Sequence, residues 1–175
     1  MIKIRKAEKN DINAVATIYS KIHTAEENGD LQIGWVRGVY PERITAESAL
    51  EREDLFVIED DNSIVGAAIL NQVQVDVYYG AAWKNDVPDN LVFVMHTLVI
   101  DPDEFGKGYG SAMVRYYEQY ALDNGCPYLR MDTNEKNLAA RTLYNKLGYN
   151  EIGIVPCKFN GIEGVQLVLL EKALK

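Results

Sequence analysis

The chain has 175 residues, of which 47% are hydrophobic, so it can build one substantial core and is expected to form a single domain over residues 1–175. Its formal net charge of −8 excludes the concentrated basic surface that nonspecific nucleic-acid binding requires. No apolar run approaches the roughly 20 residues of a membrane span and no signal peptide is recognisable, so we expect a soluble, cytoplasmic protein.

Hydrophobic periodicity predicts a strand and two helices in the first third of the chain. Alternation over residues 2–5 indicates the strand, and the apolar spacing that follows indicates a helix capped by Asn10 or Asp11. After a loop that contains several glycines, a short helix is predicted over residues 45–53, with Thr45 as its N-cap.

A hairpin is predicted next, with arms at residues 55–59 and 64–78 around a polar turn. The long arm places alternate valines on one face. A loop over residues 79–90 then precedes a strongly apolar strand over residues 91–100. That strand leads directly into a glycine-rich loop.

The second half of the chain predicts two further helices and three strands. A helix over residues 109–124 stops at an Asn-Gly pair, and a strand over residues 128–132 follows. A helix over residues 137–147 is closed by a glycine. Two final strands, at residues 151–156 and 164–170, complete a mixed α/β sheet.

The segment LVIDPDEFGKGYG, residues 98–110, passes from an apolar strand into alternate glycines that open a helix. Gly106, Gly108 and Gly110 have no Cβ, so successive N–H groups can point at one anion beside the positive end of the helix. A tight strand-to-helix connection that binds nothing is the alternative. The spacing fits neither the dinucleotide-binding motif nor the P-loop.

Residues 98–110 resemble the acyl-CoA-binding motif of the GNAT superfamily of N-acyltransferases, in which Val-x-Pro precedes Arg/Gln-x-x-Gly-x-Gly/Ala. A second segment, NLAARTLYNKLGY at residues 137–149, resembles the family's later motif, Asn-x-x-Ala-x-x-Leu-Tyr-x-Lys-x-Gly-Phe/Tyr. The resemblance implies an α/β (α+β) GNAT fold: a single mixed, mostly antiparallel twisted sheet of about seven strands, flanked by about four helices, with splayed central strands. It also implies acetyl-CoA as co-substrate. The two cysteines lack metal-ligand spacing, so no metal is expected.

The resemblance places Tyr144 at the family's general-acid position, where its hydroxyl can reach the CoA sulfur; a core tyrosine on an amphipathic helix is the alternative. The strand before the glycine loop is implied to align the thioester through its backbone. The implied acetyl-CoA-binding residues are Leu98, Val99, Ile100, Phe105, Gly106, Lys107, Gly108, Tyr109, Gly110, Ser111 and Asn137. For Asn137, a helix N-cap is an equal alternative.

One position departs from the family motif, because Phe105 stands where the family usually has Arg or Gln. Most donors in such a loop are backbone N–H groups, and Lys107 supplies charge nearby. Acetyl-CoA binding is therefore expected despite the departure.

His96 is the candidate base, because it interrupts an apolar strand shortly before the implied acyl-positioning residues. Its usual pKa of about 6.5 suits proton transfer near neutral pH, and a core histidine is the alternative. The residues considered for holding a cationic amine are Glu26, Glu27, Asp76 and Tyr79. For each of them a plain solvated residue is the alternative.

The sequence thus predicts an N-acetyltransferase that transfers an acetyl group from acetyl-CoA to a primary amine by direct attack. The acceptor is expected to be a small-molecule or peptide amine, with no nucleic-acid or membrane partner. Homodimers are frequent among relatives, so a homodimer is compatible with the resemblance. A noncatalytic acyl-CoA-binding or sensing module of the same fold is the alternative function.

Overall fold

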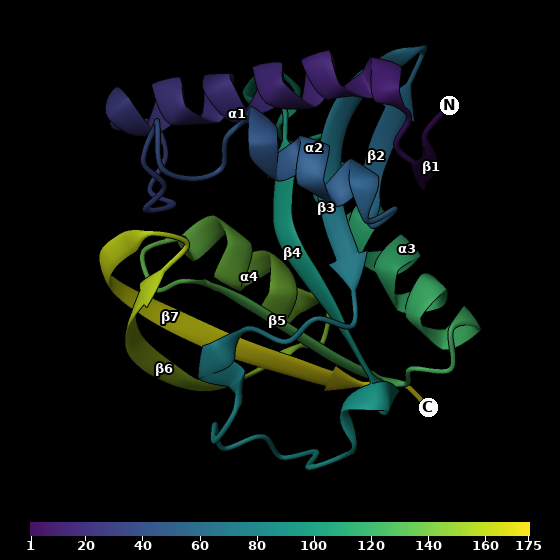
Figure 1. Cartoon of the computed structure of the whole chain (residues 1–175), viewed down its shortest axis with the longest axis vertical. Coiled ribbons are helices and arrows are strands. Elements are labelled where there is room, and N and C mark those ends of the chain that lie inside the picture. Colours follow the sequence, from purple (N-terminus) through teal and green to yellow (C-terminus); the bar gives the residue numbers. More distant parts are fainter.

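The computed structural model describes residues 1–175 and contains one seven-stranded sheet with helices on both faces (Figure 1). In chain order the elements are β1 Lys3–Lys6, α1 Ile12–Glu27, α2 Arg43–Glu51, β2 Leu55–Asp60, β3 Ser63–Asn71, β4 Val92–Ile100, α3 Tyr109–Asp123, β5 Tyr128–Asn134, α4 Leu138–Lys146, β6 Asn150–Phe159 and β7 Ile162–Ala173. The strands follow the order β1-β2-β3-β4-β5-β7-β6, and only β4 and β5 are parallel. The predicted mixed, mostly antiparallel sheet with four helices is confirmed.

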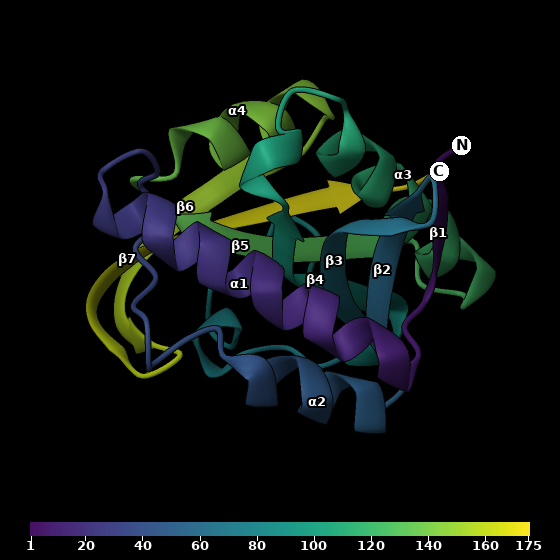
Figure 2. The ribbon, with the colours of Figure 1, turned by 90° about the horizontal axis from the view of Figure 1, so that it is seen from above.

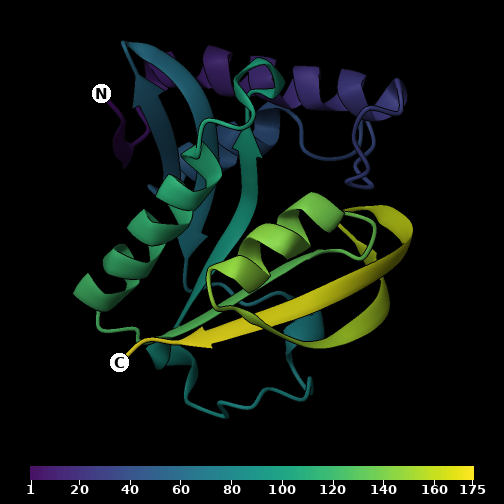
Figure 3. The ribbon, with the colours of Figure 1, turned by 180° about the vertical axis from the view of Figure 1, so that it is seen from behind.

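Side chains that alternate along each strand divide the interior between the two faces of the sheet. In β2, Phe56 and Ile58 pack with residues of α3 and α4, whereas Leu55 and Val57 pack with residues of α1 and α2. Figure 2 shows the two helix pairs on opposite sides of the sheet, and Figure 3 shows α3 and α4 from behind. No helix has both the length and the apolar composition needed to cross a membrane.

The long hairpin arm predicted over residues 64–78 is wrong beyond Asn71, where β3 ends. The Oδ1 atom of Asn71 accepts a hydrogen bond from the Val73 amide at 3.0 Å, which turns the chain out of the sheet. Of the alternate valines that indicated a strand, Val75 and Val77 pack around Tyr78, whereas Val73 is 58% exposed. Partial burial of two of these valines occurs without a strand.

The residues that cap the N-termini of α1 and α2 differ from the predicted ones. Polar side chains there form reciprocal hydrogen bonds with the backbone. Helix α2 begins at Arg43 after Glu42, and Thr45 lies one turn inside, where its Oγ1 accepts from the Glu42 amide at 3.0 Å. Asp11 directly precedes α1, but its carboxylate accepts from the Glu8 amide at 2.7 Å and not from a helix amide.

Strands β4 and β5 pair only at their first three residues. Val92–Val94 lies beside Tyr128–Arg130, and beyond this point the two strands diverge (Figure 1). The hydroxyl of Tyr117, a fully buried residue of α3, lies 2.7 Å from the carbonyl oxygen of Phe93 in β4 and 3.1 Å from that of Arg130 in β5. A side chain therefore bridges the two strands where their own pairing stops.

A β-bulge bends β4 as it leaves β5. Ala67 of β3 pairs with Val99, but Ile69 pairs with His96, so β4 contains one additional residue between the two pairs. Thr97 lies in this bulge with a φ of 50°. This left-handed conformation is unfavourable for a β-branched residue and is typical of a site where function requires an unusual backbone.

We predict that Tyr117→Phe lowers the free energy of unfolding by about 1–3 kcal/mol, because it removes the donor to two buried carbonyl groups. Urea denaturation measures the change. Tyr116→Phe is the matched control, since no hydrogen bond of the Tyr116 hydroxyl is present and its stability should be unchanged. Equal stabilities of the two variants would contradict the bridging role.

Candidate active site

A cavity of about 100 Å³ lies where β4 and β5 separate. Residues 95–98 of β4 line one wall, residues 132–134 of β5 line the facing wall, and Tyr144 of α4 lies between them. Because the facing strand edges have no partner beyond Val94, backbone N–H and C=O groups there are available to a bound molecule. The divergence of two strands has thus produced a cavity with unpaired backbone groups at its walls.

The cavity is largely apolar and contains a single acidic residue. Eleven of its 18 lining residues are hydrophobic, neither Lys nor Arg is among them, and Asp132 is the one carboxylate. A cationic group that enters this cavity is therefore attracted to Asp132.

Asp132 is a candidate functional residue that sequence reasoning missed. One carboxylate oxygen accepts a hydrogen bond from the Tyr78 hydroxyl at 2.6 Å. Burial raises the pKa of Asp132 from 3.8 to about 6, against the lowering effect of that hydrogen bond. The available signal was a polar run, Asp-Thr-Asn, at the end of a buried strand, but its closeness to β4 follows only from the sheet order.

Tyr144 extends from α4 into the cavity and is 6% exposed. Burial raises its pKa above the usual range, and the negative charge of Asp132 adds to the effect. The phenol therefore stays protonated at neutral pH. Its hydroxyl has no hydrogen-bond partner within the chain, which leaves the proton available to a bound molecule.

His96 lines the same cavity, but its ring has other partners. The Nδ2 group of Asn71 donates to Asp54, so its Oδ1 faces His96 Nε2 at 2.8 Å and accepts the imidazole proton. Burial lowers the pKa of His96 from 6.5 to about 4. The ring is neutral near pH 7 and is a weaker base than Asp132.

The glycine loop has the features expected of an anion site. Gly106 and Gly108 each have a φ of 83°, and a Cβ at either position would meet nothing within 4 Å. The amides of residues 106–108 make no hydrogen bond within the chain, and α3 begins after Gly108 without a side-chain cap. Unbonded N–H groups beside a helix N-terminus can bind a phosphate.

The side chains around this loop have different surroundings. Tyr109 is buried and donates to Asp60 at 2.7 Å, so it offers an anion only its backbone. Lys107 is exposed and pairs with Glu104, which raises the pKa of the lysine. Phe105 is 48% exposed. Gly110 lies against α4, because a Cβ there would approach Leu143 to 3.2 Å.

The remaining predicted cofactor residues lie on β4, in the first turn of α3 and at the start of α4. Leu98 lines the cavity and has no partner on β3, whereas Val99 and Ile100 pair with β3. Ser111 lies in the first turn of α3. Asn137 is the N-cap of α4, since its Oδ1 accepts from the Ala140 amide at 3.2 Å. The capping role predicted for Asn137 is thus present, and its side-chain NH₂ group remains free.

None of the four side chains considered for the amine lines the cavity. Glu26 accepts from the amides of Ile33 and Gly34 at 2.7 and 2.8 Å, so it shapes the loop before α2. Glu27 forms an ion pair with Arg37. Asp76 and Tyr79 are exposed on the segment after β3.

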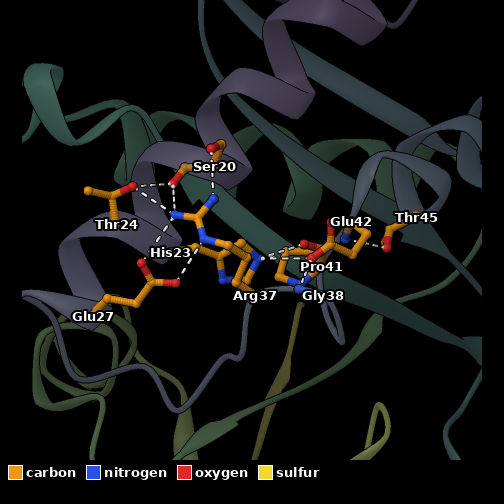
Figure 4. A network of polar contacts seen from close by, with 9 residues as sticks. All are labelled: Ser20, His23, Thr24, Glu27, Arg37, Gly38, Pro41, Glu42 and Thr45. Atoms are coloured by element: carbon orange, nitrogen blue, oxygen red, sulfur yellow. Dashed lines mark hydrogen bonds and ion pairs between the residues drawn. The ribbon is translucent and has the colours of Figure 1, made fainter.

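The loop between α1 and α2 forms a wall of the cavity and is held to α1 by polar contacts (Figure 4). Arg37 bonds to the side chains of Ser20, Thr24 and Glu27 on α1. His23 Nε2 lies 2.7 Å from the Pro41 carbonyl oxygen. These contacts fix the loop that carries Trp35 and Tyr40 to the cavity, and the Tyr40 hydroxyl bonds to Thr97 in the bulge.

The chain thus combines central strands that separate around a largely apolar cavity with a neighbouring glycine loop suited to phosphate, an arrangement compatible with an acyltransferase. The model of the acetyltransferase (GNAT) family matches residues 14–149, and the chain belongs to this family. The resemblance seen in the sequence is confirmed.

Curated relatives are similar over different lengths. The uncharacterized N-acetyltransferase YhfO of Bacillus subtilis is 23% identical over 153 residues, covering 86% of this chain and 91% of YhfO. An uncharacterized N-acetyltransferase of Methanocaldococcus jannaschii is 27% identical over 73 residues, covering 42% of this chain and 32% of that protein. The match thus spans only about a third of the archaeal relative.

Solved structures show the same fold. A GNAT-family acetyltransferase from Streptococcus agalactiae superposes with a TM-score of 0.81 at 23% identity, covering 99% of this chain and 96% of that one. YncA of Salmonella typhimurium, solved with its cofactor acetyl-CoA, superposes with a TM-score of 0.71 at 17% identity, covering 100% and 95%.

We predict that Asp132→Asn raises the free energy of unfolding at pH 7 by about 2 kcal/mol, since each pKa unit corresponds to about 1.4 kcal/mol and some solvent contact remains. The folded pKa of about 6 exceeds the unfolded value of 3.8, so ionising Asp132 costs stability as pH rises from about 4 to 6. Asparagine avoids this cost. The measurement is urea denaturation at pH 5 and pH 7.

The difference between Asp132→Asn and the natural protein should shrink as the pH approaches 4, because the folded natural protein is then protonated at Asp132. Asp76→Asn is the control, since that carboxylate is exposed and has no hydrogen-bond partner in the chain. A destabilised Asp132→Asn variant at pH 7 would show that the ionised carboxylate does not lower the stability of the folded protein.

Proposed function

We propose that the protein transfers an acetyl group from acetyl-CoA to the primary amine of an acceptor bound in the cavity between β4 and β5. The observation that carries the proposal is that the Asp132 carboxylate and the unbonded Tyr144 hydroxyl line one cavity, at the end of the strand that leads into the glycine loop. A base and an acid are the two groups that amine acetylation requires.

The residues present fit acetyl-CoA. The free amides of residues 106–108 and the first turn of α3 are suited to its pyrophosphate, and the unpaired edge of β4 at Leu98 to its pantetheine arm. Bound there, acetyl-CoA supplies an acetyl group activated as a thioester. Because these donors are backbone groups, the site depends little on Phe105 or on the acidic net charge.

Asp132 has the role of base in this proposal, and Tyr144 that of acid. The carboxylate accepts the proton that the amine loses as its nitrogen bonds to the acetyl carbon, and the phenol donates a proton to the sulfur as the C–S bond breaks. A pKa of about 6 makes Asp132 a better base than an ordinary aspartate by two pKa units. His96, with a pKa of about 4, forms part of the wall instead.

Acetyl-CoA binding should be saturable with one-to-one stoichiometry in a calorimetric titration, and ATP should bind far more weakly. Gly108→Ala should weaken acetyl-CoA binding about tenfold, because alanine disfavours the required φ of 83° by about 1–2 kcal/mol. Gly153→Ala is the matched control, since Gly153 has an ordinary φ and free space around it. If Gly108→Ala binds acetyl-CoA with unchanged affinity, the glycine loop is not part of the acetyl-CoA site.

We expect Tyr144→Phe to lower kcat by about 100-fold with an unchanged Kd for acetyl-CoA, because the phenol acts only when the thiolate leaves. Steady-state acetylation of an amine panel measures kcat. Tyr120→Phe is the control, since Tyr120 lies on α3, packs against Phe56 and does not line the cavity. Full activity in Tyr144→Phe would exclude it as the acid, and acetyl-CoA binding without any turnover would favour a sensing module.

A further inference from the structure

A second, larger hollow adjoins the cavity. It has a volume of about 470 Å³ and lies between α2 and the end of β3 with the residues that follow it. Tyr40, Val75 and His96 line both spaces, so these three side chains form the partition between the inner cavity and this outer groove. The cavity and the groove are therefore adjacent, with one layer of side chains between them.

One face of α2 forms a wall of the outer groove. Ile44, Ser48 and Arg52 are spaced four residues apart and all line it. On the opposite side lies Val73, and both Ile44 and Val73 are largely exposed, at 64% and 58%. The groove thus offers apolar side chains along its length and one cationic group.

Arg52 is that cationic group, and it is half-exposed and bonded to Asp54. Its Nε donates to Asp54 Oδ2 at 3.0 Å, and the same oxygen accepts from Asn71 Nδ2 at 2.8 Å. No hydrogen bond within the chain uses the two terminal nitrogens of the guanidinium group. Asp54 offsets part of the charge, but it also holds the guanidinium in place with its fork open to a carboxylate.

The two spaces therefore carry opposite charges. Asp132 lines only the inner cavity and Arg52 only the outer groove. Burial raises the pKa of the Tyr40 phenol, in the partition, and the hydrogen bond to Thr97 opposes this effect; the charge of Asp132 raises the pKa further, whereas that of Arg52 lowers it. A molecule with a cation at one end and an anion at the other matches this arrangement.

We propose that the acceptor is a small linear amino carboxylate, whose amine binds at Asp132 and whose carboxylate binds at Arg52. This inference rests on the proposed acetyl transfer. Because one layer of side chains separates the two spaces, the charged ends must be at least about 7 Å apart, which is two van der Waals contacts. An α-amino acid is too short for this, whereas an ω-amino acid of about six carbons is long enough.

The test compares 6-aminohexanoate with hexylamine, which has the same amine and chain length but no carboxylate. The natural protein should have at least a tenfold higher kcat/KM for 6-aminohexanoate. Arg52→Gln should abolish this preference through KM and leave hexylamine acetylation unchanged, and Arg52→Lys should retain part of it. Arg43→Gln is the matched control, because Arg43 lies on α2 outside the groove and pairs with Glu47.

Calorimetric titration of 6-aminohexanoate in the presence of CoA separates this inference from the proposed reaction. Binding that Arg52→Gln abolishes, without any acetylation, would support the groove and overturn the reaction. Acetylation of hexylamine with no preference for 6-aminohexanoate would overturn the groove and leave the reaction standing. Absence of 6-aminohexanoate binding, or an equal loss of both substrates in Arg52→Gln, also overturns the inference.

Discussion

The structure depends on the point at which β4 and β5 stop pairing. Buried backbone groups have to be satisfied, so two central strands can separate inside a sheet only where something replaces the missing partner. Here the replacement is the Tyr117 hydroxyl, which bridges the carbonyl groups of Phe93 and Arg130. The bulge at Thr97 bends β4 away, and the two helix layers hold the opened sheet from both faces.

The opened sheet determines the chemistry that the cavity can support. Charges inside it are poorly screened, so one carboxylate dominates the space and acquires a pKa of about 6. The same low polarity raises the pKa of Tyr144 further above its usual value. Burial thus raises both pKa values, and the ordinary difference between a carboxyl group and a phenol leaves Asp132 mostly ionised and Tyr144 protonated at pH 7.

Affinity for an anionic co-substrate and an acidic chain are compatible because the two depend on different groups. The net charge of −8 belongs to ionised side chains, whereas the glycine loop offers backbone amides at a helix N-terminus. Even Lys107 is paired with Glu104, so local dipoles contribute most of the attraction. The outer groove likewise depends on a single group, the Arg52 guanidinium, which is hydrogen-bonded to Asp54.

In the sequence, two motifs resembled the family and indicated Tyr144, and local spacing predicted the glycine loop and nearly all strands and helices. The prediction of a strand arm over residues 64–78 was wrong beyond Asn71, because Val75 and Val77, which pack beside a turn, have the two-residue spacing that is typical of a strand. The positions of Asp132 in the cavity and Arg52 in the outer groove were decided only by the tertiary structure. Residues far apart in the chain become neighbours through the sheet order and the divergence of β4. A local sequence pattern does not show which carboxylate will be buried.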